Sequence, residues 1–139
     1  MGLQQQTRLS GVDENGRESG PLWFRLVYMA FTIATGFCMS TLIVLFNLKS
    51  GVDVAAYEHW ARTTDLPIVN ALPSVAGFEV LRTTGLLGGG KAPFQYVEVL
   101  RLSDPAGLMT DIGTPTMQRV AGEFQEFADS PLFITTEAL

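Results

Sequence analysis

The sequence predicts an α+β fold, in which a four-stranded antiparallel sheet carries helices on one face only. The prediction rests on the order of elements, because residues 41–139 read strand, helix, strand, strand, helix, strand. This βαββαβ order leaves the other sheet face uncovered. Such an apolar face favours self-association, so we expect a homodimer in which two copies cover this face for each other. The 139 residues suit one domain, which we assign to residues 39–139, after an extension of residues 1–38.

Each element of the first half has a local signal. Residues 41–49 form an apolar, β-branched run that is typical of a buried strand. Asp53 then supplies an N-cap, and the helix after it has an apolar arc formed by Val54, Tyr57, Trp60 and Ala61. We expect Pro67 to end or kink this helix. Residues 77–84 and 94–102 alternate as the second and third strands.

The second half uses the same helix-start signal twice. Asp104 and Thr114 are N-cap residues, and each is followed by a proline that suits the first helical turn. The first of these helices stops at Gly113. The second is longer and is expected to break at Pro131. Residues 132–138 then alternate as the last strand.

The loop between the second and third strands has glycine spacing that is typical of a phosphate-binding loop, running from Gly85 to Gly90 and Lys91. We do not expect that function. Ala92 and Pro93 stand where a magnesium-binding hydroxyl residue is needed, and the next element is a strand rather than a helix. We interpret the loop as a mobile hairpin connection that could act as a lid.

Charge and rare residues exclude several function classes. The net charge is −5, and residues 39–139 account for all of it, with six basic and eleven acidic side chains. An acidic surface repels phosphate groups, so nucleic acid is not an expected partner. The single Cys38 and the single His59 allow no internal disulfide and argue against a cysteine- or histidine-rich metal site. We therefore expect a cytoplasmic protein without a metal or cofactor.

The extension has two parts. Residues 1–20 are polar and are expected to be disordered. Residues 22–38 are strongly apolar apart from Arg25, and three interpretations stay open. They form a membrane anchor, although a span usually needs roughly 20 residues. They form the core of a cleaved secretory signal. Or the extension is no part of the native protein, because Met39 directly precedes the first strand, as a translation start would.

Asp65 is the first candidate for acid–base chemistry. It stands just before Leu66 and Pro67, where the predicted helix ends, and would point into the space between helix and sheet; the alternative is an ordinary aspartate at a helix end. His59 is set aside, because helical geometry puts it about 150° from the centre of the apolar arc, on the solvent side. Tyr57 and Trp60 are most simply core residues and also belong to the candidate ligand-binding set.

Strand alternation supplies the other candidates. The apolar set of the first strand is assigned to the helices and comprises Leu42, Val44, Phe46 and Leu48. On the third strand the same division directs Val97 and Val99 towards the helices, and Tyr96 and Glu98 away from them. The open face would then hold Asn47, Tyr96 and Glu98 among apolar side chains, which is typical of a small-molecule pocket. The alternative is that the same groups are polar contacts across a dimer interface, and a bulge would reverse the assignment of the faces.

Six separated segments carry a family pattern, and they are Thr41-Leu-Ile-Val-Leu-Phe-Asn-Leu-Lys, Tyr57-Glu-His-Trp, Asp65-Leu-Pro, Leu72-Pro-Ser-Val-Ala-Gly-Phe-Glu-Val, Phe94-Gln-Tyr-Val-Glu-Val and Asp111-Ile-Gly-Thr-Pro-Thr-Met. In this order they resemble the REDY-like HapK family over residues 40–139. The resemblance implies a dimeric, ferredoxin-like α/β barrel near the EthD-like and antibiotic-biosynthesis monooxygenase proteins. It also implies a part in prodiginine or related pyrrole and indole secondary metabolism. The EthD pattern has a histidine where this chain has Asp65, so no histidine-dependent mechanism is implied.

The resemblance and these residues together predict a protein of secondary metabolism that binds a small aromatic or apolar molecule, pyrrole-, indole- or polyketide-like, and assists its cyclisation or condensation without a cofactor. Asp65 or Glu98 would move a proton, with a pKa raised by burial. Tyr96 and Asn47 would orient the ligand by hydrogen bonds. Two alternatives stay open, a cofactorless monooxygenase of the same fold group and a non-catalytic binding or chaperone-like subunit. Whether the protein is an enzyme stays open with them.

Overall fold

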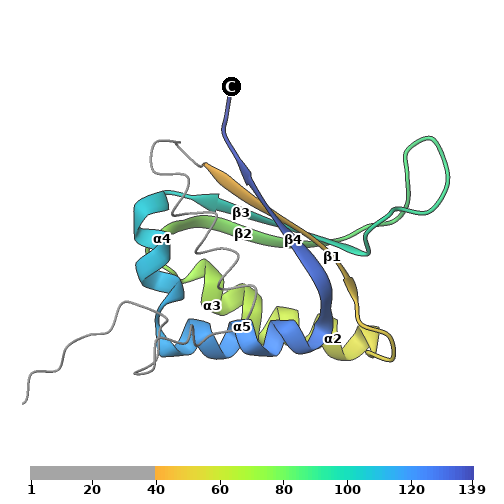
Figure 1. The fold of residues 1–139 in the computed structure, drawn as a ribbon, viewed down its shortest axis with the longest axis horizontal. Coiled ribbons are helices and arrows are strands. Elements are labelled where there is room, and N and C mark those ends of the chain that lie inside the picture. Colours follow the sequence, from red (N-terminus) through yellow and green to blue (C-terminus); the bar gives the residue numbers. More distant parts are fainter. Residues whose placement is uncertain (1–39) are drawn as a thin grey trace, which may run out of the picture.

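The computed structural model describes residues 40–139 (Figure 1), so the predictions for residues 1–38 lie outside the described residues. The elements in chain order are β1 (Thr41–Leu48), α2 (Val54–Trp60), η1 (Ala61–Asp65), α3 (Leu66–Asn70), β2 (Val75–Arg82), β3 (Tyr96–Leu102), α4 (Pro105–Ile112), α5 (Pro115–Phe127) and β4 (Ala128–Thr136). This order confirms the predicted βαββαβ arrangement. Within the described range no helix has the length and apolar character needed to cross a membrane.

The four strands form one antiparallel sheet in the order β2-β3-β1-β4. The helices of residues 40–139 all lie on the same face of this sheet, as Figure 1 shows, which confirms the predicted fold class. On the central strand β1, Leu42, Val44 and Phe46 are buried in the core beneath the helices, as the alternation predicted. The core therefore lies in a single layer between the sheet and the helices.

The predicted helix starts are confirmed by their capping hydrogen bonds. The side chain of Asp53 accepts a hydrogen bond from the N–H of Ala55 at 3.1 Å, at the start of α2. Asp104 accepts from the N–H of Gly107 at 3.0 Å, at the start of α4. Thr114 caps α5 in the same way. Each cap satisfies a backbone donor that the first helical turn leaves without a partner.

The segments α2, η1 and α3 follow one another without a break and form one helical rod with a widened turn at its centre. In that turn the N–H of Leu66 bonds to the carbonyl of Ala61, five residues back instead of four. A proline lacks an N–H and clashes with the preceding turn of a regular helix. The helix continues past Pro67 to Asn70, so of the two expected effects, an end or a kink, the end is wrong. The helix is irregular in the turn directly before the proline. Asp65 is the last residue of this widened turn.

Strand β4 begins earlier than predicted. Helix α5 ends at Phe127 and the strand follows directly, so Pro131 lies inside β4 and does not break the helix. The prediction was wrong because β4 is an edge strand, where the missing N–H of a proline is tolerated. The pairing with β1 shifts register between Leu45 and Asn47. Ser130, in the irregular stretch opposite, has a φ of 46°.

The side chains of β3 face the opposite way from the prediction. In the antiparallel register Val44 pairs directly with Glu98, and opposed residues share one face of a sheet. Glu98 and Tyr96 therefore point towards the helices and are buried, while Val97 and Val99 lie on the open face. Alternation alone could not reveal this, because the valines suit a buried face as well as an uncovered one.

The open face of the sheet is apolar. Ile43 on β1 pairs with Val99 on one side and with Ile134 on the other. Around them lie further apolar side chains of the same face, which are Leu45, Leu81, Val97 and Leu132. Leu81, Leu132 and Ile134 are 47%, 50% and 41% exposed. No helix of the described chain covers this surface (Figure 1).

The connection between β2 and β3 is a long loop that projects beyond the sheet (Figure 1). Strand β2 covers residues 75–82, so both of its ends lie two residues before the predicted ones. Strand β3 begins at Tyr96, two residues later than predicted, and ends at Leu102 as predicted. Gly85, Gly89 and Gly90 have positive φ values, which residues with a side chain rarely adopt. The positions of these glycines are therefore explained by the backbone conformation of the loop.

Candidate functional site

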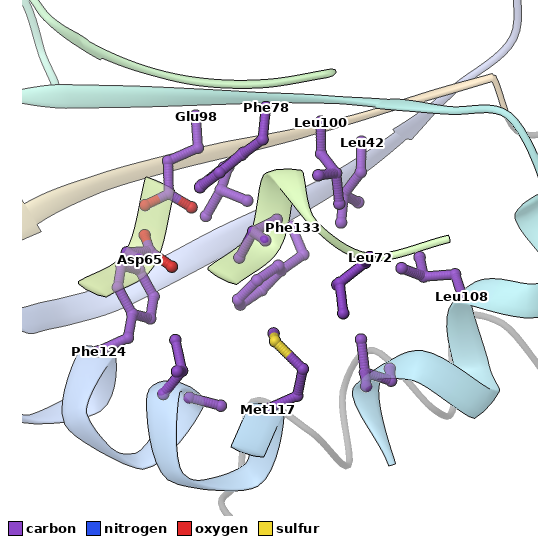
Figure 2. A pocket seen from close by; sticks show the side chains of 15 residues that line it. Leu42, Asp65, Leu72, Phe78, Glu98, Leu100, Leu108, Met117, Phe124 and Phe133 are labelled. Atoms are coloured by element: carbon purple, nitrogen blue, oxygen red, sulfur yellow. The ribbon is translucent and has the colours of Figure 1, made fainter. Parts of the chain in front are cut away.

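Asp65 and Glu98 are the two acidic side chains that the fold brings together inside the molecule. Asp65 comes from the end of η1, and Glu98 comes from the middle of β3. Their carboxyl groups point towards each other across the space between helix and sheet (Figure 2). The two residues are 5% and 6% exposed. The widened turn and the strand register thus create a buried carboxyl pair.

The carboxyl pair lies at one end of an apolar cavity of about 90 Å³. Fifteen residues line the cavity, and all of them except Asp65 and Glu98 are apolar (Figure 2). The walls come from the sheet above and from α3, α4 and α5 below. A small apolar chamber with one polar end is the usual form of a site that binds an organic molecule and fixes its orientation.

The electrostatic environment keeps protons on this pair. Burial raises the pKa of Asp65 to about 7, because a carboxylate loses its hydration there. Burial also raises the pKa of Glu98 well above its ordinary value, and the nearby Asp65 charge raises it further. The Oε1 atom of Glu98 is buried and has no hydrogen-bond partner among the described residues. Near neutral pH the pair therefore holds at least one proton and can both donate and accept.

The cavity is smaller than a bound aromatic ring requires. An engineered cavity that accepts benzene has a volume of about 150 Å³, against about 90 Å³ here. A ring must therefore displace lining side chains. Met117 on α5 is the lining residue best suited to move, because its unbranched side chain has three rotatable bonds.

Asn47 lies away from the cavity and joins two parts of the backbone. Its side-chain N–H donates to the carbonyl of Pro93 at 3.3 Å, and its Oδ1 accepts from the N–H of Gln95 at 3.0 Å. These bonds fasten the segment before β3 to the end of β1. The predicted ligand contact would therefore require Asn47 to leave these partners.

Tyr57 and Trp60 pack beside the cavity in an aromatic cluster. The ring of Tyr57 is fully buried and meets the ring of Phe46 edge-on at 5.7 Å. Its hydroxyl group is buried without a hydrogen-bond partner in the described chain, and burial raises its pKa. The indole N–H of Trp60 donates to Glu123 at 2.6 Å. Neither aromatic residue lines the carboxyl cavity itself.

Tyr96 belongs to a different polar group, centred on Glu58. The hydroxyl of Tyr96 donates to Oε1 of Glu58 at 3.0 Å, and burial together with this bond raises the pKa of Tyr96 to about 12. Arg62 and Arg82 also bind the Glu58 carboxylate, at 3.0 Å and 2.9 Å. Sequence reasoning missed this cluster. Its only sequence signal is the four-residue spacing between Glu58 and Arg62, which favours an ion pair on a helix.

The described residues contain no group of three or more His, Cys, Asp or Glu side chains that could hold a metal ion. His59 is exposed, as the helical geometry predicted. The chemistry available at the cavity is therefore that of two carboxyl groups and an apolar wall.

Comparison with solved structures finds the same fold in several proteins. The crystal structure of HapK from Hahella chejuensis is 30% identical, with a TM-score of 0.58, over 73% of this chain and 93% of that chain. An EthD family protein from Bacillus halodurans is 20% identical, with a TM-score of 0.59, over 73% and 99%. A dimeric ferredoxin-like protein from Thermobifida fusca is 16% identical, with a TM-score of 0.55, over 75% and 96%.

Comparison with curated proteins finds no match. The family model described as REDY-like protein HapK matches residues 40–139, which is the whole described range. This match and the crystal structure of HapK agree with the resemblance of the six sequence segments. The chain belongs to the REDY-like HapK family.

Proposed function

We propose that this protein binds a small aromatic or apolar molecule between its helices and its sheet and guides a cyclisation or condensation without a cofactor. One observation carries the proposal, the Asp65–Glu98 carboxyl pair facing an otherwise apolar cavity. Within the aromatic class, the family resemblance favours a pyrrole- or indole-like intermediate of prodiginine or related metabolism.

The carboxyl pair would act as a proton shuttle. With one proton shared, the protonated member donates to a leaving or carbonyl oxygen while the ionised member accepts a proton from carbon or nitrogen. Burial of both groups supports this role, because an acid whose pKa lies near the working pH transfers protons most effectively. The apolar walls would hold the reacting atoms together, which supplies much of the rate gain in such reactions.

We further propose that the working form is a homodimer joined through the open sheet face. The exposed apolar side chains of that face support a self-complementary contact. The solved ferredoxin-like neighbours from Bacteroides fragilis and Thermobifida fusca are described as dimeric.

The proton-transfer step can be tested with a model substrate. The ring opening of 5-nitrobenzisoxazole begins when a base removes its ring C–H proton, and the N–O bond then breaks to give a coloured phenolate. We expect the protein to accelerate this reaction. Asp65→Asn and Glu98→Gln should each reduce the rate by ~100-fold, since general acid–base groups contribute about that much. Met117→Ala, which enlarges the cavity, should increase turnover of this bulky ring.

The matched control is Glu126→Gln, which neutralises an exposed carboxylate on α5. It should leave the rate unchanged. If both amide variants and the Met117→Ala protein all match the wild type in rate, the carboxyl pair does not transfer protons. If the wild-type protein binds the benzisoxazole but does not accelerate its ring opening, it is instead a non-catalytic binding protein.

A further inference from the structure

A second hollow, of about 220 Å³, lies between the α2–η1 helix and the edge strand β2. Its lining combines two arginines, Arg62 and Arg82, with an apolar wall that includes Leu66 and Val80. The proposed proton chemistry makes no use of it. It shares no lining residue with the carboxyl cavity, so whatever binds here is recognised by different groups.

Both arginines are held at the rim of the hollow by one carboxylate. Nη2 of Arg62 lies 3.0 Å from Oε2 of Glu58, and Nη1 of Arg82 lies 2.9 Å from Oε1. A guanidinium has five N–H donors, and each of these contacts engages a single nitrogen. The two arginine side chains are 68% and 64% exposed. Donors on both therefore remain for a ligand.

Glu58 and Tyr96 keep this arrangement in place. The Tyr96 hydroxyl donates to the same Glu58 oxygen that Arg82 contacts. Glu58 thus links α2 to β2 through Arg82 and to β3 through Tyr96. Two positive charges and one negative charge leave the hollow with a net positive charge. That sign is opposite to the acidic excess of residues 39–139 as a whole.

The lining indicates the chemical class of the ligand. Guanidinium groups can bind a carboxylate through two parallel N–H bonds. Here Arg62 and Arg82 each bind the Glu58 carboxylate through one nitrogen, so both already lie around a carboxylate. A free inorganic anion would leave the aliphatic side chains of Leu66 and Val80 uncovered. A small organic acid satisfies both parts, with its carboxylate on the arginines and its carbon skeleton on the apolar wall.

We propose that this hollow is a binding site for the carboxylate of a small organic acid, with Arg62 and Arg82 as the binding residues and Glu58 and Tyr96 as positioning residues. The site does not depend on the carboxyl pair being a proton shuttle. It would hold an acidic ligand, or an acidic part of one, outside the apolar cavity.

The test is a titration of the full chain with benzoate, followed by amide chemical shifts and by calorimetry. We expect saturable binding, with shifts centred on residues 58–66 and 80–82. The double variant Arg62→Gln/Arg82→Gln should raise the dissociation constant at least ~10-fold, which is the usual effect of losing charged contacts of this kind. Benzyl alcohol, which has the same ring without the charge, should bind at least ~10-fold more weakly than benzoate.

Arg119→Gln is the matched control, because Arg119 pairs with Glu123 at the same four-residue spacing and 3.0 Å distance, on another helix. It should not change benzoate affinity, and neither should Asp65→Asn. Because Asp65→Asn changes the proposed proton shuttle and not the hollow, benzoate affinity tests the hollow whether or not the carboxyl pair transfers protons. Should the double variant unfold, Arg82→Gln alone replaces it.

The proposal is overturned if benzoate does not bind at millimolar concentration, or if Arg119→Gln weakens binding as much as the double variant does. Inorganic phosphate binding as tightly as benzoate would overturn the assignment to organic acids, because the apolar wall would then contribute nothing.

Discussion

Asp65 and Glu98 lie where a carboxyl group loses its hydration and finds no basic side chain among the residues that line its cavity. An isolated charge in such surroundings is strongly disfavoured, so the groups respond by keeping their protons. The same burial that raises the pKa of both groups therefore makes them unfavourable for folding once they ionise. In the proposed function, this destabilisation accompanies the proton transfer that the pair would perform.

The stability of the protein should consequently fall as pH rises through the range in which the pair ionises. The pKa of Asp65 is about 7 in the folded state and 3.8 ordinarily, and the pKa of Glu98 is raised in the same direction. The folded state thus binds more protons than the unfolded state between these values, and the free energy of unfolding decreases with pH there. Urea unfolding at about pH 5 and about pH 7 should show a loss of up to ~1.4 kcal/mol per pH unit for each titrating group.

The double variant Asp65→Asn/Glu98→Gln should have a flatter pH profile of stability than the wild type, because it removes both titrating groups. Glu126→Gln, which changes an exposed carboxylate, should keep the wild-type slope. Parallel profiles for the wild type and the double variant would show that the pair is ionised in the folded protein at all these pH values.

At the scale of single elements, the sequence predicted the features that neighbouring residues determine. It did not predict the features that depend on pairing between distant strands. The N-caps Asp53, Asp104 and Thr114 are local, and all three helix starts were predicted correctly. The inward face of β3 depends on the partner across the sheet, so alternation within the strand could not identify it. Asp65 was found as a candidate from its place before a proline.

Two other misses have the same physical origin. The proline in β4 looked like a helix breaker because nothing in the local sequence shows that β4 is an edge strand. The polar cluster around Glu58 joins four elements, α2, η1, β2 and β3, and only the pair with Arg62 is close in sequence. Both features depend on contacts between segments that are distant in the sequence, and such contacts cannot be read from a single sequence.

The irregular stretch of β4 makes an element-scale prediction. Ser130 has a φ of 46°, in the left-handed region where a side chain costs about 1 kcal/mol. Ser130→Gly should therefore raise the free energy of unfolding by up to ~1 kcal/mol. Ser103→Gly is the control, because Ser103 is also exposed but has no positive φ, and it should be neutral or destabilising. Chemical denaturation measures both, and equal effects would contradict the account.

At the scale of the whole molecule, the sheet separates two apolar regions. The buried region lies under the helices and contains the cavity, and the uncovered region lies on the opposite face. The only ion pair on the open face within the described residues joins Glu79 and Arg101 at 2.7 Å. A face of this composition is unfavourable in water, and a second copy of the chain is the simplest partner that covers it.

A charge at the centre of that face should convert the proposed dimer into a monomer. Ile43→Lys introduces an ammonium group between Val99 and Ile134 without entering the core, so the fold should persist. We expect light scattering to report half the wild-type mass at micromolar concentration. Val54→Lys, at an exposed valine on α2, should leave the mass unchanged. A dimeric Ile43→Lys protein would require a different interface.

Successive side chains of strand β3 point alternately to the cavity under the helices and to the open face of the sheet. An insertion or deletion of one residue between Tyr96 and Leu100 would send a valine into the chamber and Glu98 out to the uncovered surface. Such a one-residue slip would disrupt the proposed proton transfer and the proposed dimer contact together, whereas a point substitution affects only one of them. Length changes in this strand should therefore be far less tolerated than changes of residue type.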